Sequence, residues 1–124
     1  MPRRYATALV LALAVMTSEQ ALAHGEARAR HGGTAVMASD LGFELVGIPG
    51  GVALYIDDHG KPLAPTGFRG KIALLSGTEK AEAELVPTAD RLEARGLRLG
   101  PGVKAVATLT TAERKVITVR FSLR

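Results

Sequence analysis

Histidine is the residue type in this 124-residue sequence that points most directly to chemistry, and it occurs at three positions. These are His24, His31 and His59. Imidazole nitrogen binds Cu(II), Ni(II) and Zn(II), and Cu(II) stands first in the usual order of affinity. The chain has no cysteine, which excludes thiolate metal sites and disulfides. The three histidines are therefore the candidate metal ligands.

The residues before His24 have the pattern of a cleaved secretory signal peptide. Arg3 and Arg4 give a positive start, and residues 5–16 (YATALVLALAVM) form an almost unbroken apolar run that is too short to span a bilayer. Ala21-Leu22-Ala23 then supplies small residues at the positions that signal peptidase prefers. We predict cleavage after Ala23, which places the mature chain in the periplasm without a membrane span.

The alternative is that this apolar run is an N-terminal helix of the folded domain or an uncleaved anchor. A core helix carries polar residues at helical spacing, and the run has none beyond Thr7. We therefore assign residues 1–23 to the signal peptide and residues 24–33 to a flexible histidine-containing leader. The folded domain is predicted to cover residues 34–124.

Cleavage after Ala23 would give the first histidine a second donor. His24 would then carry a free α-amine beside its imidazole, and His31 or His59 could add a further nitrogen. Such a set suits Cu(II), with Zn(II) as the alternative. The terminal copper motif with histidine in third place is absent, because Glu26 stands there. A chance histidine in a solvated leader, and a turn-capping role for His59, are the competing interpretations.

Charge and composition argue against nucleic-acid binding and catalysis. Without residues 1–23 the chain has 14 basic and 11 acidic residues, a scattered excess with few aromatic side chains to stack on bases. No serine lies in a nucleophile elbow. Asp57 and Asp58 lie in a predicted turn, and the glycine pairs do not join a strand to a helix. We predict that the protein is not an enzyme and binds no nucleic acid.

Short apolar or alternating runs, bounded by turn residues, recur about every ten residues through the mature chain. They predict strands at 43–48, 52–57, 69–77, 81–87, 91–100, 103–110 and 115–124. About seven such strands indicate an all-β fold, an antiparallel sandwich or barrel, and of these we predict a single antiparallel sandwich of immunoglobulin type. The rival is a helix over 79–95, rich in Glu, Ala and Leu, but Pro87 would break it.

The alternation within these runs also predicts the core, because every second residue of a strand faces the same side. The predicted core consists of Leu45, Leu54, Ile56, Ile72, Leu74, Leu85, Leu92, Val106, Val119 and Phe121. The only methionine left after cleavage, Met37, follows Val36 at the start of a strand and is expected in the core as well.

Several segments together resemble a group of small exported bacterial proteins. They are HGG (31–33), FELV (43–46), LYIDDHGKP (54–62), GKIALLSG (70–77), KAVATLT (104–110) and VRFSL (119–123). The same segments resemble the N-terminal β-domain of some heavy-metal RND efflux adaptors. The resemblance implies a periplasmic β-sandwich that handles copper, zinc or cobalt, and it extends to His31 and His59. The chain lacks the hairpin, lipoyl-like and barrel domains of an adaptor.

Two classes of function remain open on the sequence. The first is a soluble periplasmic metal-binding protein, a buffer or a donor to a heavy-metal efflux system, with a component of that system as partner. The second is a non-catalytic interaction module of the cell envelope, in which the histidines are incidental. Its contact surface would be formed by edge strands and the loop over 57–67.

Overall fold

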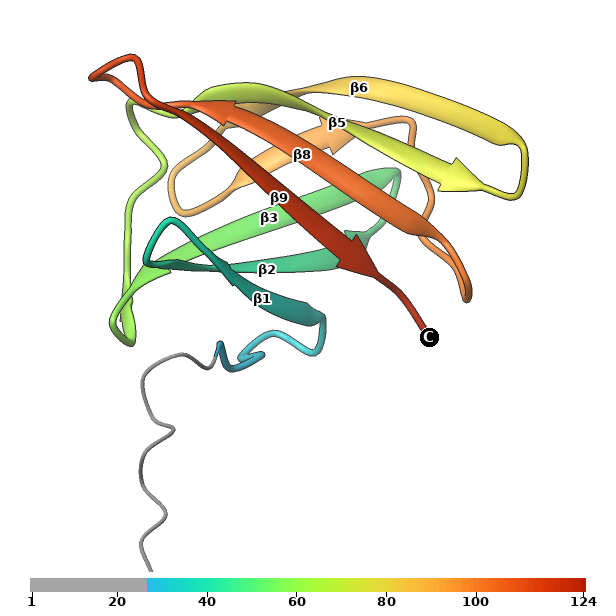
Figure 1. Ribbon diagram of the computed structural model, residues 1–124, viewed down its shortest axis with the longest axis horizontal. Coiled ribbons are helices and arrows are strands. Elements are labelled where there is room, and N and C mark those ends of the chain that lie inside the picture. Colours follow the sequence, from blue (N-terminus) through green and yellow to red (C-terminus); the bar gives the residue numbers. More distant parts are fainter. Residues whose placement is uncertain (1–26) are drawn as a thin grey trace, which may run out of the picture.

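The computed structural model describes residues 27–124, and this part of the chain is built from strands and turns. Nine strands follow one another in it (Figure 1): β1 (Thr34–Ala38), β2 (Leu41–Ile48), β3 (Gly51–Asp58), β4 (Lys61–Pro62), β5 (Arg69–Ser76), β6 (Glu79–Pro87), β7 (Leu92–Arg95), β8 (Lys104–Thr110) and β9 (Val116–Ser122). Within this range no helix is long and apolar enough to cross a membrane. The predicted signal peptide and His24 lie outside the described residues.

All strand pairs are antiparallel and form one continuous sheet in the order β1-β2-β3-β7-β6-β5-β8-β9, with β4 added beside β3. The sheet curls until its two ends, β1 and β9, lie side by side, so the shape is close to a barrel (Figure 1). The predicted all-β antiparallel class is confirmed. The predicted immunoglobulin-like sandwich of about seven strands is not confirmed, since the sheet is not divided in two.

Strand β6 is the reason that the sheet stays continuous. Its residues 79–85 pair with β5, and its last two residues, Val86 and Pro87, pair with β7. A strand of nine residues can therefore join the β5–β8–β9 half of the molecule to the β1–β2–β3–β7 half. The region 79–95, where a helix was the alternative, consists of β6, a turn and β7, so the strand prediction is confirmed.

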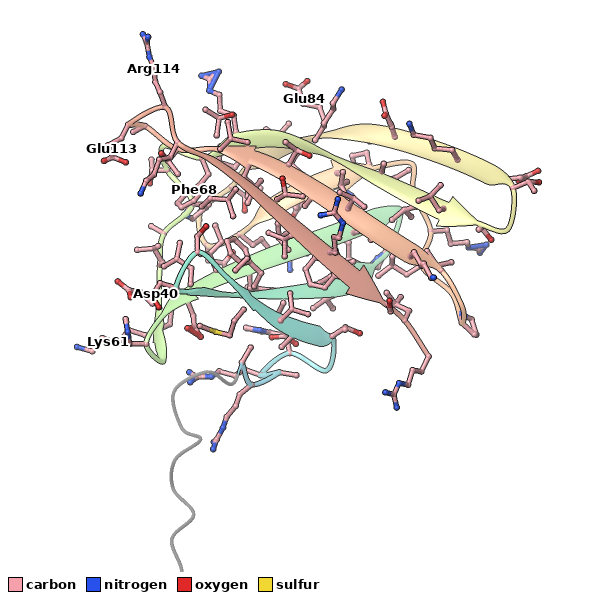
Figure 2. All side chains as sticks on the ribbon, in the orientation of Figure 1. Asp40, Lys61, Phe68, Glu84, Glu113 and Arg114 are labelled. Atoms are coloured by element: carbon pink, nitrogen blue, oxygen red, sulfur yellow. The ribbon has the colours of Figure 1, made fainter. Side chains whose placement is uncertain are left out.

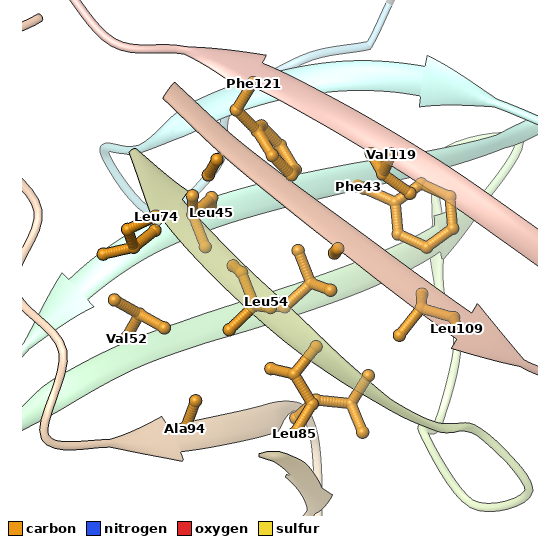
Figure 3. Close-up of a cluster of buried hydrophobic side chains, with 14 of the residues drawn as sticks. Phe43, Leu45, Val52, Leu54, Leu74, Leu85, Ala94, Leu109, Val119 and Phe121 are labelled. Carbon is orange, nitrogen blue, oxygen red and sulfur yellow. The ribbon is translucent and has the colours of Figure 1, made fainter. Parts of the chain in front are cut away.

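The core lies inside the curled sheet and is formed by inward residues from most strands (Figure 3). Nine of the ten predicted core residues are buried, and the exception is Val106. In β8 the inward positions belong to Ala105, Ala107 and Leu109, so Val106 faces outward and is only half-buried. The prediction that Val106 belongs to the core is therefore wrong, because its position in β8 alternates with the inward residues.

The same parity decides what lies on the outer surface of β2 and β3. Phe43 pairs with Ile56, and Leu45 pairs with Leu54; all four side chains are buried in the core. The residues between them, Glu44 and Tyr55, also face each other across the strand pair. Successive side chains of a strand point to opposite faces, so Glu44 and Tyr55 lie together on the outside of the sheet.

Candidate functional site

Among residues 27–124, Glu44 is the one charged residue that is buried, with only 5% of its surface exposed. Its carboxylate lies on the outer face of β2, where the described part of the leader, residues 27–33, approaches it (Figure 1). The backbone N–H groups of Arg30, His31 and Gly33 all donate to this carboxylate, at 2.9, 2.8 and 2.8 Å. Glu44 therefore binds three backbone donors of a segment that precedes it by 11 to 14 residues.

The His31 side chain completes the set of donors around Glu44. Its Nδ1 lies 3.0 Å from Oε1 of Glu44. An ionised carboxylate can only accept, so the proton lies on Nδ1 and the free position of the ring is Nε2. Burial alone raises the pKa of the Glu44 carboxyl, but the hydrogen bonds from Arg30, Gly33 and His31 outweigh it and lower that pKa below its usual value.

Tyr55 supports the other side of the imidazole. The rings of His31 and Tyr55 are stacked, with centroids 3.6 Å apart and planes 4° from parallel. Arg91 donates to the Tyr55 hydroxyl at 2.7 Å and pairs with Glu93, which also binds Arg95. The aromatic ring that contacts His31 is thus held by Arg91, the residue before β7, which pairs in turn with Glu93 on that strand.

Gly33, the last residue of the HGG segment, is required by the close approach of the leader to β2. A Cβ at this position would overlap the carbonyl oxygen of Leu45 and would lie 2.7 Å from Cγ2 of Val46. The obstacle is partly backbone, so it cannot be relieved by a change of rotamer alone. Glycine at position 33 therefore allows its own N–H to reach Glu44.

We expect Gly33→Ala to displace the leader from β2 and to lower the free energy of unfolding by about 1–3 kcal/mol, the usual cost of an overpacked site. Amide hydrogen exchange should become faster at residues 30–33 and stay unchanged in β8 and β9. Gly100→Ala is the matched control, because a Cβ there meets no atom within 4 Å and its backbone is outside the left-handed region. Equal effects of the two substitutions would contradict the close-contact explanation.

His59 lies in the turn between β3 and β4, with 77% of its side chain exposed. Its Nδ1 is 2.7 Å from Oδ1 of Asp58, and its φ of +54° is a left-handed conformation. The hydrogen bond to Asp58 and the negative charges of Asp58, Asp40 and Asp57 raise the pKa of His59 above its usual value. Asp40 and Lys61 mark this end of the molecule in Figure 2.

Arg30 brings the leader and the His59 turn together. Its guanidinium Nη1 donates to the carbonyl oxygen of Gly60 at 3.0 Å, while its backbone N–H binds Glu44. A mainly apolar pocket of about 310 Å³ opens between the leader and the sheet; its lining includes Ala27, His31, Tyr55, Asp57 and Pro62. The leader, β3 and the β3–β4 turn therefore meet at one place on the outer surface.

No protein family, curated protein or solved structure matches this chain at a significant level. The resemblance to efflux-adaptor domains therefore stays a prediction.

The structure describes two of the three predicted metal ligands, His31 and His59, on segments that Arg30 connects. The third, His24, lies outside the described residues. Among residues 27–124 no group of three histidine or acidic side chains is arranged to hold a metal ion. The flexibility predicted for the leader, residues 24–33, stays a prediction. Met37, expected in the core, is 38% exposed.

Sequence reasoning missed Glu44 and Tyr55. The sequence did contain one sign that Glu44 is unusual. It is a charged residue inside the apolar run FELVGI, between the core residues Phe43 and Leu45. A solvated outer face explains such a residue equally well. Glu44 is buried because the leader covers it, and the position of the leader is known only from the tertiary structure.

Proposed function

We propose that this protein is an exported, non-catalytic metal-binding protein of the periplasm that takes Cu(II), with Zn(II) as the alternative. Its role would be to buffer the metal or to donate it to a heavy-metal efflux system. The observation that carries this proposal is that both described histidines have Nδ1 against a carboxylate, His31 at 3.0 Å from Glu44 and His59 at 2.7 Å from Asp58.

This pairing is typical of histidines that bind metals. A metal-ligating imidazole usually donates its second ring N–H to a carboxylate or carbonyl, which selects the tautomer and makes the other nitrogen a better ligand. In both pairs Nε2 is the nitrogen left for a ligand. The side chains of His31 and His59 keep 43% and 77% of their surfaces exposed, so both can be approached from solvent.

The arrangement of the segments supports a shared site. The hydrogen bond from Arg30 to Gly60 connects the residue before His31 with the residue after His59. His24 precedes Ala27, which lines the same pocket as His31, by three residues. Three extended residues span at most about 10 Å, so the covalent chain allows the predicted amine and imidazole of His24 to reach this region.

The location and the partner rest on the sequence. The predicted cleavage after Ala23 supports export to the periplasm and would create the α-amine of His24. The resemblance to adaptor domains supports a component of an RND efflux system as the recipient of the metal. Intact mass of periplasmic material should show the loss of residues 1–23, and retention of these residues would remove the amine from the proposed ligand set.

We expect the mature protein, residues 24–124, to bind one Cu(II), and His24→Ala or His31→Ala to weaken binding at least tenfold. A form with one residue added before His24 keeps every imidazole and displaces the amine, so it measures the contribution of the amine. Isothermal titration with Cu(II) and Zn(II) gives the affinities. Binding should strengthen as pH rises, because protons compete with the metal for the same nitrogens. Since the pKa of His59 is raised, protons compete for its ring at higher pH than for an ordinary imidazole.

If neither metal binds, or if all the forms bind Cu(II) with the same affinity, the histidines are incidental. The interaction-module alternative would then be favoured, with the β3–β4 turn and the exposed apolar side chains of Val86 and Val116 as the first surfaces to test.

A further inference from the structure

The two carboxylate–histidine pairs differ in how firmly the carboxylate is held. The Asp58 side chain is 52% exposed, and it is adjacent in sequence to His59 in a surface turn. The Glu44 side chain is 6% exposed and accepts three backbone N–H bonds besides the one from His31. Exposed pairs of this kind contribute little, whereas a buried carboxylate with several donors is restricted to one position.

Glu44 and Tyr55 together restrict the His31 ring in two independent ways. The hydrogen bond to Oε1 of Glu44 determines which ring nitrogen carries the proton and where that edge of the ring points. The stacking on Tyr55, at 3.6 Å and 4°, determines the plane of the ring. With one edge and one face occupied, the Nε2 edge is the position left for an external ligand.

We infer that Glu44 is a positioning residue that presents Nε2 of His31 as the fixed first ligand of the metal, whereas His59 joins as an adjustable second ligand. This inference rests on the proposed function, because it assigns roles within the same site. In this inference the Glu44 carboxylate on β2 holds the proton on Nδ1 of His31 and so makes Nε2 the atom that binds the metal. The metal site would thus depend on contact between the leader and the sheet.

The wild-type protein alone provides the first test, without metal. Two-dimensional ¹H–¹⁵N spectra of the imidazole rings, recorded at about pH 8 where an ordinary imidazole is neutral, report which nitrogen of each histidine is protonated. We expect His31 to be almost entirely the Nδ1–H tautomer. The opposite Nε2–H tautomer, which dominates in a free imidazole side chain, would overturn the inference whether or not the protein binds metals.

The second test compares substitutions of the two carboxylates by titration with Zn(II). We expect Glu44→Gln to lower the Zn(II) affinity about 10- to 100-fold, the usual effect of removing the partner of a ligating histidine. Asp58→Asn is the matched control and should lower it less than about fivefold, because its pair is exposed. Far-ultraviolet circular dichroism checks that both variants keep the strand content of the wild type.

The outcomes separate this inference from the proposed function. Equal affinities of Glu44→Gln and wild type, together with a tenfold loss in His31→Ala, would overturn the positioning role and leave the proposed ligand in place. Wild-type affinity in His31→Ala would overturn both. If Glu44→Gln fails to fold, the tautomer of His31 in the wild type still decides, because that measurement needs no variant.

Discussion

Glu44→Gln is expected to lower the free energy of unfolding of the metal-free protein by about 2–4 kcal/mol, the range for breaking a buried charged group away from its partners. The carboxylate accepts from three backbone N–H groups and from Nδ1 of His31. A glutamine at this position keeps one acceptor oxygen and turns an NH₂ group toward the remaining donors. Urea denaturation, followed by circular dichroism, measures the difference.

The same substitution should change how stability depends on pH. The folded-state pKa of Glu44 is lowered, so the ionised carboxylate stabilises the fold fully at pH values above the ordinary value of about 4.3. That contribution disappears as the pH falls through the lowered folded-state pKa. The gap between wild type and Glu44→Gln should therefore be widest near neutral pH and should narrow in acid.

Glu84→Gln is the control for this prediction, because Glu84 is an exposed carboxylate on β6 (Figure 2). Its effect should stay within about 0.5 kcal/mol at any pH, as is usual for surface positions. A Glu44→Gln variant as stable as wild type near neutral pH would show that the bonds between Glu44 and the leader do not persist in solution.

Phe43→Ala is expected to lower the free energy of unfolding by about 3–5 kcal/mol, more than Glu44→Gln. The ring is 1% exposed and belongs to the cluster of buried side chains inside the curled sheet (Figure 3). Its removal leaves a cavity that the surrounding strands cannot close completely. For a domain of this size a loss of that order is a large part of the total stability.

Thermal or urea denaturation measures this loss, and Val116→Ala is the matched control. Val116 is 64% exposed at the start of β9, so its truncation should change the free energy of unfolding by less than about 0.5 kcal/mol. Similar losses in the two variants would mean that the interior around Phe43 is not packed as the structure shows.

Much of the fold could be predicted from local sequence, because a strand that is buried on one side alternates apolar and polar residues. The last strand shows this clearly, since Ile117, Val119 and Phe121 are buried and the residues between them are exposed. The alternation is weaker in β8, where small and β-branched residues mix, and there Val106 was assigned to the wrong face. Side-chain size is a poorer guide than parity in such a strand.

The connections between the strands could not be predicted in the same way. The division of β6 between β5 and β7 depends on pairings of residues far apart in sequence, and on the curvature that brings β1 beside β9. Seven runs of the right spacing are compatible with a sandwich or with one curled sheet. Long-range pairing selects between them, and no local pattern encodes it.

By itself the sequence indicated which residues could do chemistry, the three histidines, and placed His24 and His31 in the leader and His59 in a turn, since residue type and turn signals are local properties. Only the tertiary structure decided how His31 and His59 are held. Glu44 is 13 residues from His31 and Tyr55 is 24 residues from it, yet one binds its Nδ1 and the other stacks on its ring. Such contacts arise because antiparallel pairing puts Glu44 opposite Tyr55 and Gly33 lets the leader lie against β2.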